Sequence, residues 1–318
     1  MHQNRKSLLK TIALMGALCL FHPAWAAPLA YTTNEKDGTI SVIDTQTDEV
    51  IDTFKAAEKP RGAVITPDGE HMFISDQPND ALVVVDLKTR KVTDTIPIGV
   101  SPEGVGISPD GKWIAAASER THTVSFINTD SHKKIFEVKM QGRNPEHAEF
   151  SPDGKWVYVS AEEEEHVDIV DVAQRKSVDL VWVGVRPRGI GFLPDNSRAY
   201  VACELSNSVT VLDIATKKVI ASEPAGERAN GVKVLPNGKK VYISNGEGTL
   251  SVLDTATNKM VATIKVGKRP WNMATTPDSK KLYVANGKSN SISVIDTSTD
   301  QVIKEIPVGN TPWGVFIR

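Results

Sequence analysis

The sequence predicts an all-β fold: a seven-bladed β-propeller with four-stranded blades, closed by a C-terminal strand that joins the N-terminal blade. Three observations predict it, namely an internal repeat, a recurrent proline turn, and a match between the two ends of the chain. The chain has 318 residues, of which 40% are hydrophobic, so it has enough apolar material for a large core.

An apolar strand that ends in Asp or Asn recurs along the chain with a period of about 42 residues. The strand ends are Asp44, Asp86, Asn128, Asp171, Asp213, Asp254 and Asp296. A repeat of this length is typical of one propeller blade made of four short strands. Seven recurrences therefore predict seven blades, and the strand-end Asp residues are predicted to form turns.

Residues 102–140 show the pattern within one unit. The expected strands are 103–108, 113–117, 123–127 and 134–138. A Pro-Asp-Gly turn separates the first two strands, and a related turn recurs in six units. Proline fixes φ, aspartate can bind its own backbone, and glycine accepts a positive φ. Almost no helix is expected, because no window of useful length places apolar residues at helical spacing.

The ends of the chain predict how the ring closes. Residues 31–34 (Tyr-Thr-Thr-Asn) match the second strand of a unit, and residues 312–317 match a first strand. One blade is therefore expected to contain both ends, which leaves only short, protected sheet edges.

Residues 1–26 are predicted to be a secretory signal peptide. Arg5 and Lys6 precede an apolar stretch over residues 11–21, and Ala24-Trp25-Ala26 fits a cleavage site. The stretch is too short to span a bilayer comfortably, so no transmembrane segment is predicted. Residues 27–318 are expected to be a single propeller domain in the periplasm.

Charge and cysteine content narrow the classes of partner. The formal net charge is −2, and the leader carries Arg5, Lys6 and Lys10, so the mature chain is more acidic. This balance gives no reason to expect a nucleic-acid partner.

Cleavage leaves Cys203 without an intramolecular partner, so we expect a buried, inert thiol and a fold stabilised by packing. The protein is expected to be a monomer.

The repeat resembles a known family. Residues 242–245 (Tyr-Ile-Ser-Asn), 283–286 (Tyr-Val-Ala-Asn) and 293–296 (Ser-Val-Ile-Asp) look like the YVTN β-propeller repeat. Residues 37–44 and 101–105 make the chain similar to the propellers associated with PQQ-dependent alcohol catabolism. That resemblance implies a periplasmic accessory of PQQ dehydrogenases, and more distant relatives by fold bind haem.

The chain departs from the enzymes near this family. It has no CxxCH haem-attachment motif and no cysteine pair for a protein-derived cofactor. It also lacks a Gly-x-Ser-x-Gly elbow, a His-Glu-x-x-His motif and a P-loop. These observations favour binding over catalysis. No catalytic residue, cofactor or metal ligand is predicted.

The loops that enter the first strands are the best candidates for a binding site, because they converge at the mouth of the channel. The predicted rim residues are Arg61, Glu103, Glu146, His147, Arg186, Arg188, Arg228, Asn230, Arg269, Trp271 and Trp313. Guanidinium groups bind carboxylates or phosphates, and indole faces stack on planar rings. A small planar anion such as PQQ fits this combination, as does an acidic loop of a partner protein. Alternatively, the arginines pair with Glu103, Glu146 and Glu227 and only make the rim soluble.

An acidic run over residues 162–165, followed by His166, is expected on the same face as the rim. It is either a solvated loop or a docking patch for a basic partner such as a cytochrome. His122, His147 and His166 come from adjacent units but lack metal-site spacing.

Three functions remain open. The leading hypothesis is a periplasmic binding or scaffold protein that serves a PQQ-dependent alcohol oxidation system, with a PQQ dehydrogenase or a cytochrome as a partner. The second is an enzyme, either a cofactor-binding redox enzyme related to the haem-binding propellers or a lactone-hydrolysing propeller. The third is a nucleic-acid or cell-surface binder. Fold alone does not choose among them.

Overall fold

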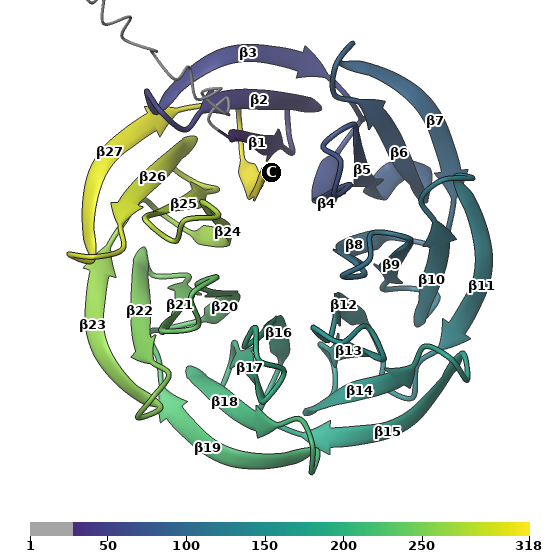
Figure 1. The fold of residues 1–318 in the computed structure, drawn as a ribbon, viewed down its shortest axis with the longest axis vertical. Coiled ribbons are helices and arrows are strands. Elements are labelled where there is room, and N and C mark those ends of the chain that lie inside the picture. Colours follow the sequence, from purple (N-terminus) through teal and green to yellow (C-terminus); the bar gives the residue numbers. More distant parts are fainter. Residues whose placement is uncertain (1–27) are drawn as a thin grey trace, which may run out of the picture.

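The computed structural model describes residues 28–318, which form seven four-stranded antiparallel sheets around a central channel (Figure 1). The predicted seven-bladed propeller is therefore confirmed. The expected signal peptide, residues 1–26, lies outside the described residues. Within residues 28–318, no helix is long and apolar enough to cross a membrane.

The blades are numbered from the one that holds both ends of the described chain, and their strands are given from the channel outward. Blade 1 consists of β28 (Pro312–Ile317), β1 (Leu29–Asn34), β2 (Thr39–Asp44) and β3 (Glu49–Lys55). Blade 2 consists of β4 (Pro60–Ile65), β5 (His71–Asp76), β6 (Ala81–Asp86) and β7 (Lys91–Pro97). Blade 3 consists of β8 (Pro102–Ile107), β9 (Trp113–Ser118), β10 (Thr123–Asn128) and β11 (Lys133–Lys139). Blade 4 consists of β12 (Pro145–Phe150), β13 (Trp156–Ala161), β14 (His166–Asp171) and β15 (Lys176–Trp182).

The remaining blades repeat this order. Blade 5 consists of β16 (Pro187–Phe192), β17 (Arg198–Cys203), β18 (Ser208–Asp213) and β19 (Lys218–Pro224). Blade 6 consists of β20 (Ala229–Val234), β21 (Lys240–Asn245), β22 (Thr249–Asp254) and β23 (Lys259–Lys265). Blade 7 consists of β24 (Pro270–Thr275), β25 (Lys281–Asn286), β26 (Ser291–Asp296) and β27 (Gln301–Pro307). A short 3-10 turn, η1 (Gln77–Asn79), connects β5 to β6.

The ring closes as the sequence predicts. Strand β28 pairs antiparallel with β1, and Tyr31 lies opposite Phe316. The hydroxyl of Thr32 donates a hydrogen bond of 2.8 Å to the carbonyl of Gly314. Because this pairing joins segments from opposite ends of the chain within blade 1, it closes the ring of blades.

The turns use the predicted residues. The carboxylate of Asp213 accepts hydrogen bonds from the backbone N–H and the hydroxyl of Thr216, and Asp254 does the same with Thr257. In the Pro-Asp-Gly turns, Gly111 has a φ of 73°. The strand-end Asp residues thus form turns, as predicted.

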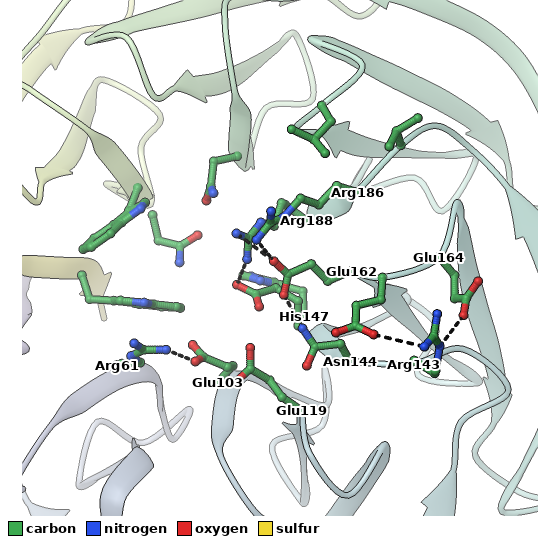
Figure 2. A pocket seen from close by; sticks show the side chains of 18 of the residues that line it. Arg61, Glu103, Glu119, Arg143, Asn144, His147, Glu162, Glu164, Arg186 and Arg188 are labelled. Atoms are coloured by element: carbon green, nitrogen blue, oxygen red, sulfur yellow. Dashed lines mark hydrogen bonds and ion pairs between the residues drawn. The ribbon is translucent and has the colours of Figure 1, made fainter.

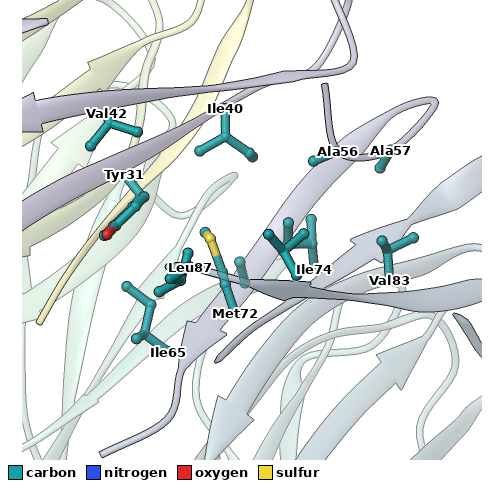
Figure 3. Close-up of a cluster of buried hydrophobic side chains, with 12 residues drawn as sticks. Tyr31, Ile40, Val42, Ala56, Ala57, Ile65, Met72, Ile74, Val83 and Leu87 are labelled. Carbon is teal, nitrogen blue, oxygen red and sulfur yellow. The ribbon is translucent and has the colours of Figure 1, made fainter. Parts of the chain in front are cut away.

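Hydrophobic cores lie between neighbouring blades rather than at the centre of the ring. Figure 3 shows the cluster between blades 1 and 2, where Tyr31, Ile40 and Val42 face Met72 and Ile74. An equivalent cluster fills each interface among the described blades. Since packing between blades absorbs the apolar side chains of the middle strands, the innermost strands are left to line the channel.

Cys203 ends β17 and is fully buried. Burial raises the pKa of its thiol to about 11, so the thiol stays protonated at neutral pH. The predicted burial of this cysteine is therefore confirmed, and its raised pKa favours an inert thiol.

Candidate functional site: the mouth of the channel

A charged cavity of about 760 Å³ opens where the innermost strands begin. All of the predicted rim residues line it except Arg228, which is exposed on blade 6 beside it. The structure also adds residues to the predicted set. Glu35, Glu119, Arg143, Asn144, Asn272 and the run 162–165 line the same cavity. More glutamates than arginines line the mouth, so its net charge is negative.

Arg188, at the start of blade 5, lies at the centre of a carboxylate cluster. Its guanidinium contacts Glu146 at 2.7 Å, Glu162 at 3.1 Å and Glu204 at 2.8 Å. Arg186 binds Glu162 and also contacts Glu204 at 3.1 Å. Figure 2 shows Arg186 and Arg188 reaching toward Glu162 from the same side of the mouth. Two arginines are therefore shared among three glutamates.

Attraction between the arginines and the glutamates holds this cluster together. Burial alone would lower the pKa of Arg188, yet the three carboxylates together raise it above its usual value. Burial and the neighbouring Glu146 raise the pKa of Glu162, whereas Arg188 and Arg186 oppose the change. Because these guanidiniums already hold carboxylates of the protein, they are not free to bind a carboxylate of a ligand.

Arg61, on blade 2, is compensated in the same way. Its guanidinium binds Glu103 on blade 3 and lies 3.1 Å from Glu35 on blade 1. Lys59 contacts Glu35 as well, at 3.1 Å. Figure 2 shows the bond between Arg61 and Glu103 at the opposite side of the mouth from Arg188. The alternative of arginine–glutamate pairing is thus observed for Glu103 and Glu146, but Glu227 makes no ion pair among the described residues.

Sequence reasoning placed the acidic run 162–165 on this face, but it did not align the position that follows the second strand, which holds glutamate in four of the seven blades. The residues at this position, in blades 1 to 7, are Glu35, Gln77, Glu119, Glu162, Glu204, Gly246 and Gly287. In six blades the backbone N–H at this position donates to the carbonyl of the residue that precedes the innermost strand, at 2.9 to 3.1 Å. The two columns of residues are therefore neighbours at the mouth. Aligning second-strand ends as well as first-strand starts would have revealed them.

Blades 6 and 7 break this pattern because glycine replaces the glutamate. A Cβ at Gly246 would meet the Arg228 side chain at 3.0 Å, and a Cβ at Gly287 would meet the Trp271 ring at 2.7 Å. The missing side chains give Arg228 and Trp271 their room. Within residues 28–318, neither Arg228 nor Arg269 makes an ion pair.

Arg269 directly precedes β24 of blade 7 and lines the cavity at the mouth. Its guanidinium lies 5.5 Å from the centre of the Trp271 ring. Burial lowers the pKa of Arg269, and neighbouring arginines lower it further against the opposing charge of Glu204. An excess of positive charge therefore remains at blades 6 and 7, which we call the basic sector and define as Arg228, Arg269 and Trp271.

The opposite side of the mouth is acidic and partly apolar. Glu163, Glu164 and Glu165 connect β13 to β14, and Arg143 contacts the first two of them at 3.5 and 2.8 Å. The neighbouring side chains of Trp182, Val185 and Leu205 are exposed, Trp182 by 63% and Leu205 by 57%. We call these three apolar residues, together with Glu163, Glu164 and Glu165, the acidic sector.

The three histidines do not converge. The Nδ1 atom of His122 accepts a hydrogen bond from the backbone of Asn144, and His166 packs against Trp182 with ring centres 5.3 Å apart. His147 lies in the channel, where burial and Arg188 lower its pKa to about 4. It is therefore neutral at physiological pH.

One group of carboxylates has the proximity of a cation site. Ligand oxygens of Glu119, Glu146 and Glu162 lie within 4.8 Å of one another, and hard cations prefer such ligands. Two of these three carboxylates already bind arginines, as described above. The third, Glu119, accepts a hydrogen bond of 2.6 Å from the hydroxyl of Ser101 and makes no ion pair among the described residues, so the group is only partly compensated.

The fold defines this chain as a seven-bladed β-propeller, and charged residues line the mouth of its channel. Residues 181–303 match the family described as "Lactonase, 7-bladed beta-propeller", and residues 25–107 match the "YNCE-like beta-propeller" family. Each match covers less than half of the chain. No curated protein sequence matches it.

Solved structures confirm the architecture. A functionally unknown protein from Desulfotomaculum acetoxidans is 17% identical, with a TM-score of 0.82 over 92% of this chain and 99% of that one. Hydrazine synthase of Kuenenia stuttgartiensis is 22% identical, with a TM-score of 0.74 over 81% of this chain and 89% of that one. Dihydro-haem d1 dehydrogenase NirN, in complex with DHE, is 17% identical, with a TM-score of 0.66 over 90% of this chain and 66% of that one. At these identities the likeness concerns the fold alone.

Proposed function

We propose that this chain is a periplasmic binding protein that holds a small planar anion at the basic sector of its channel mouth. The observation that carries the proposal is the glycine substitution in blades 6 and 7, which leaves Arg228 and Arg269 without carboxylate partners beside Trp271. Free guanidiniums bind carboxylates or phosphates, and an indole face stacks on a planar ring. The other rim arginines are excluded because glutamates already hold them.

The repeat's resemblance to propellers of PQQ-dependent alcohol catabolism supports one particular ligand. PQQ is a planar polyanion, and such a molecule matches two guanidiniums beside an indole. The proposed role is therefore that of an accessory to a PQQ-dependent alcohol oxidation system, which binds or delivers the cofactor.

Titration of PQQ against tryptophan fluorescence tests this proposal. The wild-type protein is expected to bind saturably, and Arg228→Glu combined with Arg269→Glu is expected to weaken binding at least about tenfold. Lys239→Glu is the matched control, because Lys239 is an exposed residue of blade 6 in the turn at the other end of the sheet. Equal affinities of the double variant and the control would overturn the proposal, as would absence of binding to the wild type.

A second function is favoured by the acidic sector. Exposed Trp182 and Leu205 lie beside a run of glutamates, and exposed aromatic residues are frequent hot spots of protein interfaces. This combination supports docking of a basic partner, such as a periplasmic cytochrome or a PQQ dehydrogenase with a basic patch.

Biolayer interferometry with a purified basic cytochrome c tests the docking function. Glu163→Lys combined with Glu165→Lys is expected to slow association strongly at low salt, since rim charges act mainly on the association rate. Glu70→Lys combined with Asp130→Lys is the matched control, because both residues are exposed outside the mouth. If the two double variants behave alike, the acidic sector is a solvated loop.

A further inference from the structure

Below the mouth, the channel continues into a second cavity of about 460 Å³. His147, Asn272 and Trp313 line both cavities, so the two are adjacent. Valine, isoleucine, phenylalanine and glycine form most of the wall of this lower channel. Its size falls within the range of small-molecule sites, which are mostly apolar with a few placed polar groups.

Besides His147, the lower channel has three titratable side chains, Glu149, Lys233 and Arg318. Arg318 lies at the end of the chain, where its guanidinium donates to the carbonyl of Pro67 at 2.8 Å. Glu149 and Lys233 occupy the fifth position of β12 and of β20, respectively. They therefore face the channel at the same level from blades 4 and 6.

A glycine occupies the equivalent position on the strand between Glu149 and Lys233. The fifth position of the intervening strand β16 is Gly191, and the corresponding position on the other side of Glu149 is Gly106 in β8. A Cβ at Gly191 would meet Val232 at 3.0 Å and Val234 at 3.2 Å. The valine side chains of β20 therefore cover Gly191, and no side chain from β16 stands between Glu149 and Lys233 at this level.

Neither charge is compensated. In the described part of the chain, the Glu149 carboxylate and the Lys233 ammonium make no hydrogen bond and no ion pair. Burial raises the pKa of Glu149 to about 7, and Lys233 only partly opposes this effect. A partly buried charge without a partner is costly, and groups of this kind are concentrated at functional sites.

We propose that the lower channel binds a short zwitterion, whose ammonium group contacts Glu149 and whose carboxylate contacts Lys233. The apolar body of the ligand would lie against the wall between the two blades, over Gly191. Such a ligand supplies both missing counter-charges at once, whereas a molecule with a single charge leaves one group uncompensated. This site is separate from the basic sector and does not depend on the function proposed for the mouth.

Isothermal titration calorimetry with linear amino acids tests the site. The probes are γ-aminobutyrate, δ-aminovalerate and ε-aminocaproate, with hexylamine and hexanoate as ligands that carry only one charge. One member of the series is expected to bind the wild type, and Glu149→Gln or Lys233→Met is expected to weaken it by at least about 30-fold. Glu70→Gln and Lys239→Met are the matched controls, because both residues are exposed outside the lower channel.

A charge exchange separates loss of the site from loss of the fold. Glu149→Lys combined with Lys233→Glu keeps both charges and reverses their order, so it is expected to bind the same ligand in the opposite orientation. Arg228→Glu with Arg269→Glu is expected to leave this binding unchanged, which distinguishes the site from the basic sector. Binding that survives Glu149→Gln and Lys233→Met, or a wild type that binds no member of the series, would overturn the proposal.

Discussion

The arginine–glutamate clusters at the mouth and the lower channel differ in how their charges are paired. At the mouth, Arg188 contacts three glutamates and Arg61 contacts two. In the lower channel, Glu149 and Lys233 have no such partners among the described side chains, although the surrounding wall is more apolar. The difference teaches that abundant charge and unpaired charge are distinct in this propeller, and the site proposed in the lower channel follows the unpaired charge.

The largest expected effect on stability comes from removing Arg188 from the arginine–glutamate cluster at the mouth. Arg188→Met removes a cation that contacts three carboxylates, two of them buried, and we expect a loss of about 3–5 kcal/mol in the free energy of unfolding. Arg143→Met is the matched control, because the Arg143 side chain is 60% exposed and surface ion pairs contribute about 1 kcal/mol or less. Urea denaturation measures both. Equal, small losses would show that the mouth cluster is not a structural unit.

The next effect is the pH dependence of stability that arises from Glu149 in the lower channel. The folded state raises the pKa of Glu149 from its usual 4.5 to about 7, so its protonated form is the more stable one. The associated stability is present below pH 4.5 and is lost as pH rises toward 7. We expect wild type to lose about 1–3 kcal/mol relative to Glu149→Gln across this window.

The comparison with Glu149→Gln isolates that carboxyl group from its channel neighbours. His147 has the opposite dependence, because its pKa is lowered to about 4 and its stabilising effect is lost as pH falls below 6.5. Lys233 and Arg318 also face the lower channel. All three are present in both proteins, so their effects largely cancel in the difference. A difference that does not vary with pH would contradict the assignment.

A smaller effect tests whether a ligand lies over Gly191. Gly191→Ala meets only the side chains of Val232 and Val234, so we expect about 1 kcal/mol of destabilisation. Gly106→Ala meets the backbone carbonyl of Ala148, which cannot move as easily, and should destabilise more. Thermal unfolding measures both. We also expect Gly191→Ala to weaken zwitterion binding, because it shifts the valine wall, and unchanged affinity would show that the ligand does not lie against Gly191.

The smallest change in stability is expected at the basic sector. Gly246→Glu gives blade 6 the residue found at the same position in four other blades. The new carboxylate would pair with exposed Arg228, so we expect a stability change of about 0.5 kcal/mol or less. Anion affinity at the mouth should nevertheless fall, which fluorescence titration measures. Retained affinity would show that Arg228 takes no part in binding.

The repeat in the sequence was sufficient to predict the ring, its closure and the rim. Period, turn residues and the matching ends of the chain are local patterns, and the packing between blades simply repeats them. The first-strand alignment also placed Arg61, Glu103 and Arg188 at one opening, because equivalent positions in a ring converge on its axis.

The partners of these residues could not be predicted from that alignment. Glu35, Glu162 and Glu204 follow second strands, and they meet the rim only because the sheet folds back on itself. Glu149 and Lys233 were visible in the repeat, but whether two charges pair depends on side-chain reach and on the width of the channel. These are three-dimensional quantities that a repeat pattern does not encode.

The ionisation of Glu149 tests the contrast between the arginine–glutamate clusters and the lower channel most directly. Carbon-13 NMR of carboxyl-labelled glutamate, with Glu149→Gln to assign the signal, measures its pKa in the folded protein. We expect a value of about 7 in the absence of ligand. A value near the usual 4.5 would mean that Glu149 is solvated or paired, and it would contradict the account of an uncompensated lower channel.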